Sequence, residues 1–128
     1  MRLLLDTHVL IWALTDDSRL SADARRWIED ERNQIYFSAA SIWEIAIKHA
    51  LSPKQVPVSS VELRSFCFEA GYREVAIDSA HAVAVSELPP HHKDPFDRIL
   101  VAQALSEPLC LLTHDSIVCK YSDAIRRV

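Results

Sequence analysis

The chain has 128 residues, of which 49% are hydrophobic and 25% charged, which indicates one globular domain over residues 1–128 and excludes a disordered chain. Its single glycine, Gly71, excludes the phosphate-binding and dinucleotide-binding loops that need several glycines in a short span. The net charge of −4 weighs mildly against a nucleic-acid partner, although divalent cations held among clustered acids would raise the local potential.

Short aliphatic runs alternate with helical patterns along the chain. Residues 2–5 are predicted to form a buried strand that stops at Asp6, and residues 7–14 are apolar nearly all round, which indicates a buried helix. Ser21 is the predicted N-cap of the next helix, because apolar residues follow it at helical spacing.

The later elements continue this alternation. They are, in chain order, a strand at 35–37, a helix from Ser38 or Ser41 to about His49, a helix at 61–70 ending at Gly71, a strand at 74–77, a helix at 79–86, a helix from Asp94-Pro95 to about Leu105, a strand at 109–112 and a short fifth strand at 124–128. Strands that alternate with helices predict an α/β fold with a parallel sheet covered on both faces. Ligands of such sheets bind beyond the carboxyl ends of the strands.

Four acidic residues lie where predicted strands end or predicted helices begin: Asp6, Glu44, Asp97 and Asp115. Because these positions belong to the same end of a right-handed α/β layout, we expect the four carboxylates to converge. Carboxylates that lie close together repel one another, and a divalent cation removes that penalty. Oxygen ligands without Cys or His suit Mg²⁺ or Mn²⁺, which support phosphodiester hydrolysis by activated water.

The first two acids also have structural interpretations. Asp6 alone can be a turn residue at a strand end, although a carboxylate after three leucines is costly unless it is paired or functional. Glu44 fits a Ser41-x-x-Glu44 capping box and lies four residues before Lys48, so its sequence context is equally consistent with a structural role.

The other acids are similarly ambiguous when each is taken alone. Asp94 is best explained as the N-cap before Pro95, and Asp97 can serve the dipole of the same helix. Asp115 can be a turn residue or a cap for the segment 116–120. The shared location of the four acids therefore carries the functional interpretation.

Four segments of the chain resemble the motifs of the PIN domain, most closely those of VapC-like toxins from bacterial toxin–antitoxin pairs. The segments are Leu3-Leu4-Leu5-Asp6-Thr7-His8, Ser38-Ala39-Ala40-Ser41-Ile42-Trp43-Glu44-Ile45, Asp94-Pro95-Phe96-Asp97-Arg98 and Leu112-Thr113-His114-Asp115. The likeness extends from Met1 to the C-terminus in the same motif order. It is therefore more specific than any one motif.

This resemblance implies a three-layer α/β/α sandwich with a parallel sheet of four or five strands. It also implies an Mg²⁺- or Mn²⁺-dependent endoribonuclease, a cognate VapB-like antitoxin that blocks the site, and frequent homodimerisation. Carried over residue by residue, the family's acidic quartet is Asp6, Glu44, Asp97 and Asp115. Thr7 and Thr113 match the hydroxyl residues that orient ligands or water beside substrate.

Other polar and aromatic residues have simpler predicted roles. Arg98, directly after Asp97, is the expected contact for RNA phosphates. The six histidines show no metal-ligand spacing, and His91 and His92 are expected in a solvated loop. The tryptophans at 12, 27 and 43 lie among apolar residues and are expected in the core.

Cysteine usage and hydropathy indicate the compartment. Cys67, Cys110 and Cys119 are odd in number and widely spaced, which indicates reduced thiols rather than a disulfide framework or a zinc site. No apolar run has the length of a signal-peptide core or a membrane span. We therefore expect a cytoplasmic protein with no membrane association.

Two other functions fit parts of the pattern. A phosphatase with an aspartyl nucleophile after the first strand needs a second Asp two residues later, but that position is His8. A non-catalytic PIN-like module that binds RNA or protein is the stronger alternative, although four intact acids argue against loss of the catalytic site. Metal-dependent RNA cleavage distinguishes the enzyme from the binding module.

Overall fold

A five-stranded parallel sheet forms the centre of the structure, a computed structural model that describes residues 1–128. The strands are β1 (Arg2–Leu5), β2 (Gln34–Ser38), β3 (Arg73–Val75), β4 (Cys110–Thr113) and β5 (Arg126–Arg127). Their order in the sheet is β3-β2-β1-β4-β5, so β1 is central and pairs with both β2 and β4. The predicted sheet is confirmed, with five strands.

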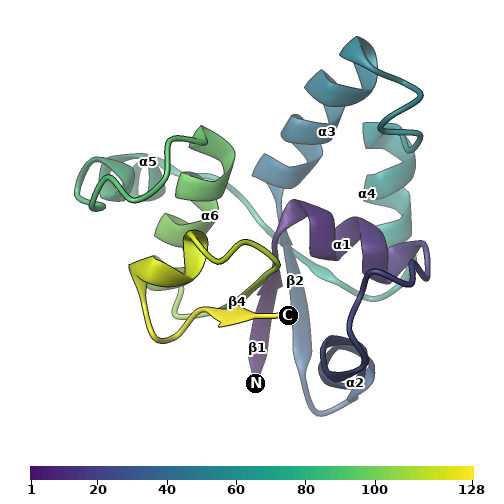
Figure 1. Cartoon of the computed structure of the whole chain (residues 1–128), viewed down its shortest axis with the longest axis horizontal. Coiled ribbons are helices and arrows are strands. Elements are labelled where there is room, and N and C mark those ends of the chain that lie inside the picture. Colours follow the sequence, from purple (N-terminus) through teal and green to yellow (C-terminus); the bar gives the residue numbers. More distant parts are fainter.

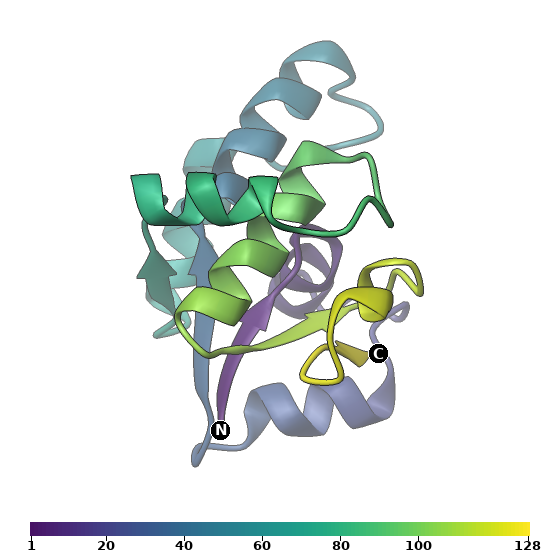
Figure 2. The same ribbon diagram turned by 90° about the vertical axis from the view of Figure 1, so that its left-hand side faces the viewer.

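Helices cover both faces of this sheet (Figures 1 and 2). They are α1 (Thr7–Leu14), α2 (Ala22–Glu29), α3 (Ala39–Leu51), α4 (Ser60–Glu69), α5 (Ser79–Ser86), α6 (Pro95–Ser106) and the short 3₁₀ helix η1 (Val118–Tyr121). Apolar residues of α1, α2 and α4 pack on one face, and α6 and η1 pack on the other. This arrangement is the expected three-layer α/β/α sandwich.

The alternation of side chains along β1 explains why two separate cores form. Leu3 and Leu5 point to the core beneath α1, α2 and α4, whereas Leu4 points to the core beneath α6. All three leucines are fully buried. A continuous apolar run is therefore what a parallel strand covered on both faces requires.

Helix caps fix several boundaries that the sequence predicts. The Ser21 hydroxyl accepts a hydrogen bond from the Ala24 amide at the start of α2. Asp94 caps α6 directly before Pro95, as expected. Gly71 follows α4 with a φ of 80°, in the left-handed region where a glycine carries no Cβ strain.

Two expectations about α3 are wrong. Its N-cap is Ser38, whose hydroxyl accepts from the Ala40 amide, so Ser41 and Glu44 do not form a capping box. Trp43 is 59% exposed instead of buried in the core, because α3 projects beyond the sheet and leaves part of its apolar surface uncovered. Figure 1 shows the far end of α3 extending away from the strands.

The remaining differences from the predicted elements concern the ends of the strands. The third strand spans Arg73–Val75 rather than 74–77, and the fourth and fifth span Cys110–Thr113 and Arg126–Arg127 rather than 109–112 and 124–128. All three cysteines are free thiols. None of the helices combines the length and the apolar character needed to cross a bilayer.

Candidate active site

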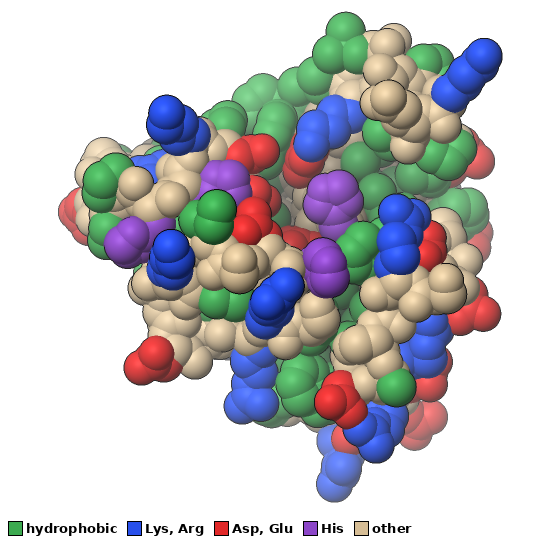
Figure 3. Space-filling view, in the orientation of Figure 1, with side chains coloured by type: hydrophobic (Ala, Val, Ile, Leu, Met, Phe, Trp, Pro, Cys, Tyr) green, Lys and Arg blue, Asp and Glu red, His purple; other side chains and the backbone are tan.

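A cavity of about 510 Å³ opens beside the carboxyl ends of β1 and β4. Its lining residues, which define the acidic cavity below, are Asp6, Thr7, His8, Trp12, Arg19, Glu44, Lys48, His92, Asp94, Asp97, His114 and Asp115. The cavity lies where the strand order reverses direction around β1, the position at which ligands of α/β sheets bind. Figure 3 shows acidic side chains and histidines gathered in the hollow between α3, α6 and α1. The four predicted acids therefore line one cavity.

Asp6 lies at the floor of this cavity and is 5% exposed. Its Oδ1 accepts a hydrogen bond from the Val9 amide at 2.8 Å and so caps α1, while Oδ2 accepts from the Thr113 hydroxyl at 2.5 Å. Burial raises the pKa of Asp6 above its ordinary value despite these hydrogen bonds. Both oxygens are thus fixed in direction, which suits a ligand and argues against a mobile nucleophile.

Glu44 lies in the second turn of α3 and is also buried. Its Oε1 accepts a hydrogen bond from the Thr7 hydroxyl at 2.7 Å, and that hydroxyl lies 2.9 Å from Ser41 Oγ. Its Oε2 forms an ion pair with Lys48, which confirms the predicted contact between residues four apart in a helix. Because the Lys48 ammonium already offsets its charge, Glu44 suits contact with a cation through water better than direct ligation.

Asp97 lies in the first turn of α6 and is the acid with the fewest partners. Its nearest charged or polar neighbour is His92, whose Nε2 lies 3.0 Å from Asp97 Oδ2. Burial raises the pKa of Asp97 to about 7, and the negative charges of Asp94, Asp6 and Glu44 add to this effect. A nearby cation would therefore stabilise the charged form of Asp97.

Asp115 follows β4 and faces the same histidine. Its Oδ1 accepts from the Ile117 amide at 2.8 Å, and its Oδ2 lies 3.0 Å from His92 Nε2. Partial burial raises the pKa of Asp115, but the hydrogen bonds from Ile117 and His92 outweigh it, so this pKa lies below the ordinary value. Thr113 links Asp115 to Asp6, because its Oγ1 accepts from the Asp115 amide while its hydroxyl proton goes to Asp6.

The two threonines each hold a carboxylate of the cavity in place. Thr113 is fully buried beneath the cavity, and Thr7, which lines it, is 4% exposed. Each donates to a carboxylate, Thr113 to Asp6 and Thr7 to Glu44. Both hydroxyls thus orient acids of the site, and their predicted contact with substrate stays a prediction.

Arg98, the predicted phosphate contact, does not line the acidic cavity. Its guanidinium points away from the acidic cavity and donates to the backbone carbonyls of Val85 at 3.0 Å, Pro89 at 3.1 Å and His92 at 3.3 Å. The Arg98 guanidinium also donates to the Tyr121 hydroxyl at 3.0 Å. Adjacent residues of a helix project about 100° apart, so Asp97 can face the cavity while Arg98 anchors the preceding loop.

Two residues at the site were missed by the sequence analysis. His92 is only 18% exposed and lies between Asp97 and Asp115, whereas a solvated position was expected. Lys48 lines the cavity as a half-exposed cation, although the sequence suggested only a helix-surface pair. The His-x-Asp-Pro arrangement directly before α6 was the available signal for His92, because it places the ring next to a helix N-terminus.

Helix geometry adds to the electrostatics of the acidic cavity. Asp6 is the N-cap of α1, Asp94 is the N-cap of α6, and Asp97 occupies the first turn of α6. The N-terminal ends of both helices therefore face the acids with their partial positive charge. This arrangement allows several carboxylates to share one small space.

The side chains fit a hard divalent cation. The oxygens of Asp97 and Asp115 that point into the cavity have no partner other than His92, and the Asp6 carboxylate lies close enough to raise the pKa of Asp97. A set dominated by carboxylate oxygens suits Mg²⁺ or Mn²⁺. Asp6 and Asp97 are the residues best suited to hold the ion, with Asp115 beside them.

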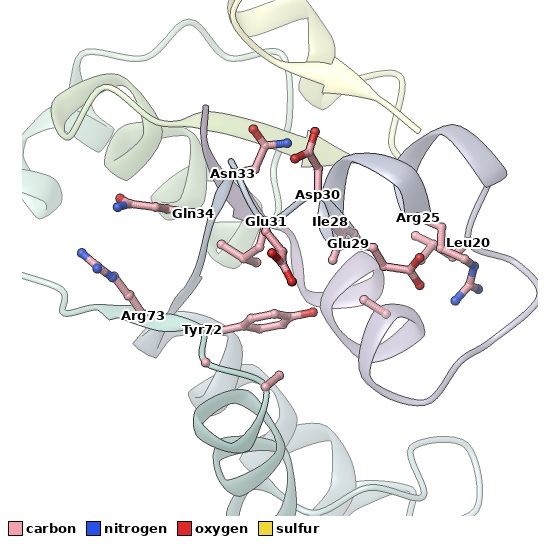
Figure 4. Close-up of a pocket in the computed structure, with 14 residues that line it drawn as sticks. Leu20, Arg25, Ile28, Glu29, Asp30, Glu31, Asn33, Gln34, Tyr72 and Arg73 are labelled. Carbon is pink, nitrogen blue, oxygen red and sulfur yellow. The ribbon is translucent and has the colours of Figure 1, made fainter.

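A second cavity, of about 450 Å³, lies at the opposite end of the sheet, where β2 and β3 begin (Figure 4). In this view Tyr72 points between Glu31 and Glu29. Arg25 is paired with Asp16, and Asp30 is paired with Arg32. Because no group of metal-ligating side chains converges there, the acidic cavity remains the candidate active site.

Another acid–histidine group lies between α5 and α6 and is explained by packing. The buried His81 has its Nε2 2.7 Å from Glu107 at the end of α6, and its Nδ1 accepts from the amide of Asp78, the N-cap of α5. This group joins two helix ends and lies outside the acidic cavity.

The sequence model of the PIN domain matches residues 3–124, which is nearly the whole chain. The chain belongs to the PIN domain family. In this PIN domain the acids contributed by four separate segments line one cavity, in the order in which the motifs occur along the chain.

Solved structures show the same fold at low sequence identity. A chain of VapBC2 from Rickettsia felis, bound to a DNA fragment from its promoter, superposes with a TM-score of 0.64 and 16% identity, covering 100% of this chain and 98% of the other. DNA-bound VapBC from Salmonella typhimurium gives a TM-score of 0.68 and 14% identity, covering 100% and 97%. VapBC-1 from nontypeable Haemophilus influenzae gives 0.65 and 13%, with the same coverage.

No curated protein matches this sequence closely enough to count as a relative. The solved structures therefore establish the shared fold of this PIN domain, and its own residues must carry the argument for activity.

Proposed function

We propose that this PIN domain is an Mg²⁺- or Mn²⁺-dependent endoribonuclease and the toxin of a toxin–antitoxin pair. The observation that carries the proposal is the arrangement of Asp6, Glu44, Asp97 and Asp115 around one open cavity beyond β1 and β4. The fold shared with chains of VapBC complexes supports the same assignment.

The bound cation would activate water and stabilise charge on the phosphate during hydrolysis. Asp6 and Asp97 would hold it, with Asp115 completing the set and Glu44 acting through water. Thr113 fixes the Asp6 carboxylate, and Thr7 fixes Glu44. Lys48 and Arg19 are the cations that line the cavity and would contact RNA phosphate, because Arg98 is engaged with the 85–92 backbone.

The decisive experiment is cleavage of a structured RNA with Mg²⁺ or Mn²⁺, with and without EDTA. We expect metal-dependent cleavage that falls at least about 100-fold in Asp6→Asn and in Asp97→Asn, as follows when metal ligation is lost. Asp123→Asn is the matched control, because Asp123 is an exposed acid outside the cavity. Undiminished cleavage in both site variants would disprove the assignment, and RNA binding without cleavage would favour the non-catalytic module.

The partner we propose is a VapB-like antitoxin that covers the acidic cavity. Its existence is inferred from the fold shared with chains that were solved in VapBC complexes. Purification of the protein from its native host should yield a bound small DNA-binding protein that suppresses RNA cleavage. Recovery of the protein alone, with full activity, would contradict this proposal.

We also propose a homodimer that uses the exposed apolar stripe of α3. The stripe consists of Trp43, Ile47 and Leu51, which are 59%, 38% and 78% exposed and follow one another at four-residue spacing along one helix face.

Light scattering should show a dimer at micromolar concentration and a monomer for Leu51→Glu, because a charge at that position would be buried by dimerisation. Val83→Glu places the same charge at an exposed apolar residue of α5 and should leave the mass unchanged. A monomeric wild-type protein would refute the dimer.

A further inference from the structure

His92 lies between two of the proposed metal ligands, and its hydrogen bonds determine what its ring can do. Nε2 is 3.0 Å from Asp97 Oδ2 and 3.0 Å from Asp115 Oδ2. An imidazole nitrogen next to two carboxylates suggests a third metal ligand at first sight. The other ring nitrogen argues against that role.

Nδ1 of His92 accepts a hydrogen bond from the backbone amide of Asp94 at 3.1 Å. A nitrogen that accepts carries no proton, so the neutral ring has its proton on Nε2. A metal can bind only an unprotonated ring nitrogen. Moving the proton to Nδ1 would place two N–H groups face to face, so this geometry favours donation from Nε2 to Asp115, with the Asp97 carboxylate in contact with the same nitrogen at 3.0 Å.

The backbone around His92 holds the ring in this orientation. The His92 amide donates to the Tyr121 hydroxyl at 2.8 Å, and the His92 carbonyl accepts from Arg98 at 3.3 Å. Residues of α6 and η1 therefore fix both sides of the His92 backbone, while the Asp94 amide fixes the ring. Each Asp oxygen that contacts Nε2–H keeps further lone-pair capacity toward the open cavity.

We propose that His92 is a positioning residue: its Nε2–H holds the Asp97 and Asp115 carboxylates together and keeps the cation site composed of oxygen ligands. This inference rests on the proposed cation site but not on RNA cleavage. An oxygen-only site favours Mg²⁺ and Mn²⁺, whereas a ligating imidazole would favour Zn²⁺.

Calorimetric titration of the full chain with Mg²⁺, Mn²⁺ and Zn²⁺ tests the proposal without RNA. For His92→Ala we expect the Kd for Mg²⁺ and for Mn²⁺ to rise by a similar factor, about tenfold, as is typical when a partner that orients a ligand is lost. His92→Gln carries an amide N–H near the position of Nε2 and should restore most of the affinity. His91→Gln, in the exposed neighbouring residue, should bind like the wild-type protein.

Three results would overturn the proposal. A larger loss for Mn²⁺ and Zn²⁺ than for Mg²⁺, without rescue by Gln, would make His92 a ligand. Tighter binding in His92→Ala would make it a competitor of the cation, and unchanged binding would leave it no role at the site.

Nitrogen-15 spectra of the histidine rings give a second and direct readout. The signal assigned by its loss in His92→Gln should show the Nε2–H tautomer in the metal-free protein and keep it after Mg²⁺ is added. An Nδ1–H tautomer in either state would contradict the proposal. A protein that passes these tests but cleaves no RNA would disprove the nuclease alone, and cleavage with the wrong tautomer would disprove the role of His92 alone.

Discussion

Thr113 lies buried beneath the acidic cavity and makes two hydrogen bonds that serve different acids. Its hydroxyl donates to Asp6 at 2.5 Å, while its Oγ1 accepts from the Asp115 amide at 3.0 Å. One buried hydroxyl thereby ties the acid after β1 to the turn after β4. The geometry of both acids depends on an atom that never reaches the cavity surface.

Replacing Thr113 with Val keeps the shape of the side chain and removes this hydroxyl. We expect divalent-cation affinity to fall about 10-fold to 100-fold, since an orienting partner of a ligand is lost. The free energy of unfolding should fall by about 1–3 kcal/mol, because the buried Asp6 carboxylate loses a donor. Calorimetry and urea unfolding measure the two effects.

Thr15→Val is the matched control for this change, because the Thr15 hydroxyl is exposed and bonds only the Ile11 carbonyl of its own helix. It should change neither quantity by much. Cation affinity that stays at the wild-type value in Thr113→Val would show that Asp6 needs no such support.

Placing residues from sequence alone succeeded where a local pattern determined the position. Asp6 follows a run of three leucines, and Asp97 follows an Asp-Pro cap, so both could be assigned to the correct end of the sheet. His92 could not be placed, because its position depends on Tyr121, which is 29 residues away. Adjacency to Asp97 in sequence did not place Arg98 in the cavity, because its guanidinium binds the backbone of the preceding loop.

Two adjacent residues at the start of α6 contact different parts of the molecule, the acidic cavity and the loop before the helix. Asp97 faces the acidic cavity, and Arg98 holds the 85–92 segment through four backbone carbonyls. The same segment carries His92 to its place beside Asp97 and Asp115. We therefore expect Arg98 to affect the site through the loop rather than through RNA.

Arg98→Met removes these hydrogen bonds and keeps the length of the aliphatic stem. The free energy of unfolding should fall by about 2 kcal/mol, because partly buried carbonyls lose a charged donor. Guanidinium unfolding measures this change, and Lys93→Met in the exposed part of the loop is the control. Unchanged stability with weaker RNA binding would return Arg98 to the phosphate-contact role.

At the scale of helices and strands, capping residues predicted the helix starts better than amino-acid composition predicted burial. Asp94-Pro95 and Ser21 predicted two helix starts correctly. For α3, Ser38 and Ser41 were both suitable caps, and the correct one is decided by the end of β2 at Ser38. Trp43 was wrongly expected in the core because composition does not reveal that α3 projects beyond the sheet.

The folded state as a whole should respond to pH through the acidic cavity. The pKa of Asp97 is raised by burial from 3.8 to about 7, so between these values the folded chain binds more protons than the unfolded chain. The free energy of unfolding contributed by this group therefore falls as pH rises from about 4 to about 7, by at most about 1.4 kcal/mol per pH unit. Outside this window its contribution is constant.

Urea unfolding of the metal-free protein between pH 4 and 8 measures this slope. Asp97→Asn cannot ionise, so the difference between the wild-type and variant curves isolates the carboxylate from the other groups, including Asp6 and Asp115. We expect the variant to gain stability relative to the wild type as pH rises. Parallel curves would show that Asp97 has an ordinary pKa.

The overall architecture was predictable because strand and helix patterns alternate without interruption and the motifs keep their order. The five-stranded parallel sheet and both helical layers follow from that alternation. Short strands at the sheet edges were placed less accurately, since β3 and β5 have only three and two residues and little pattern to define them.

The convergence of the α1 and α6 N-termini on the acids has a consequence for the protein when no cation is bound. Backbone dipoles offset part of the carboxylate repulsion even when no ion is bound. The cation of the proposed function would then leave and rebind while the chain stays folded. The concentration of free magnesium in the surroundings, rather than a slow refolding step, would set the fraction of the protein that is ready to act.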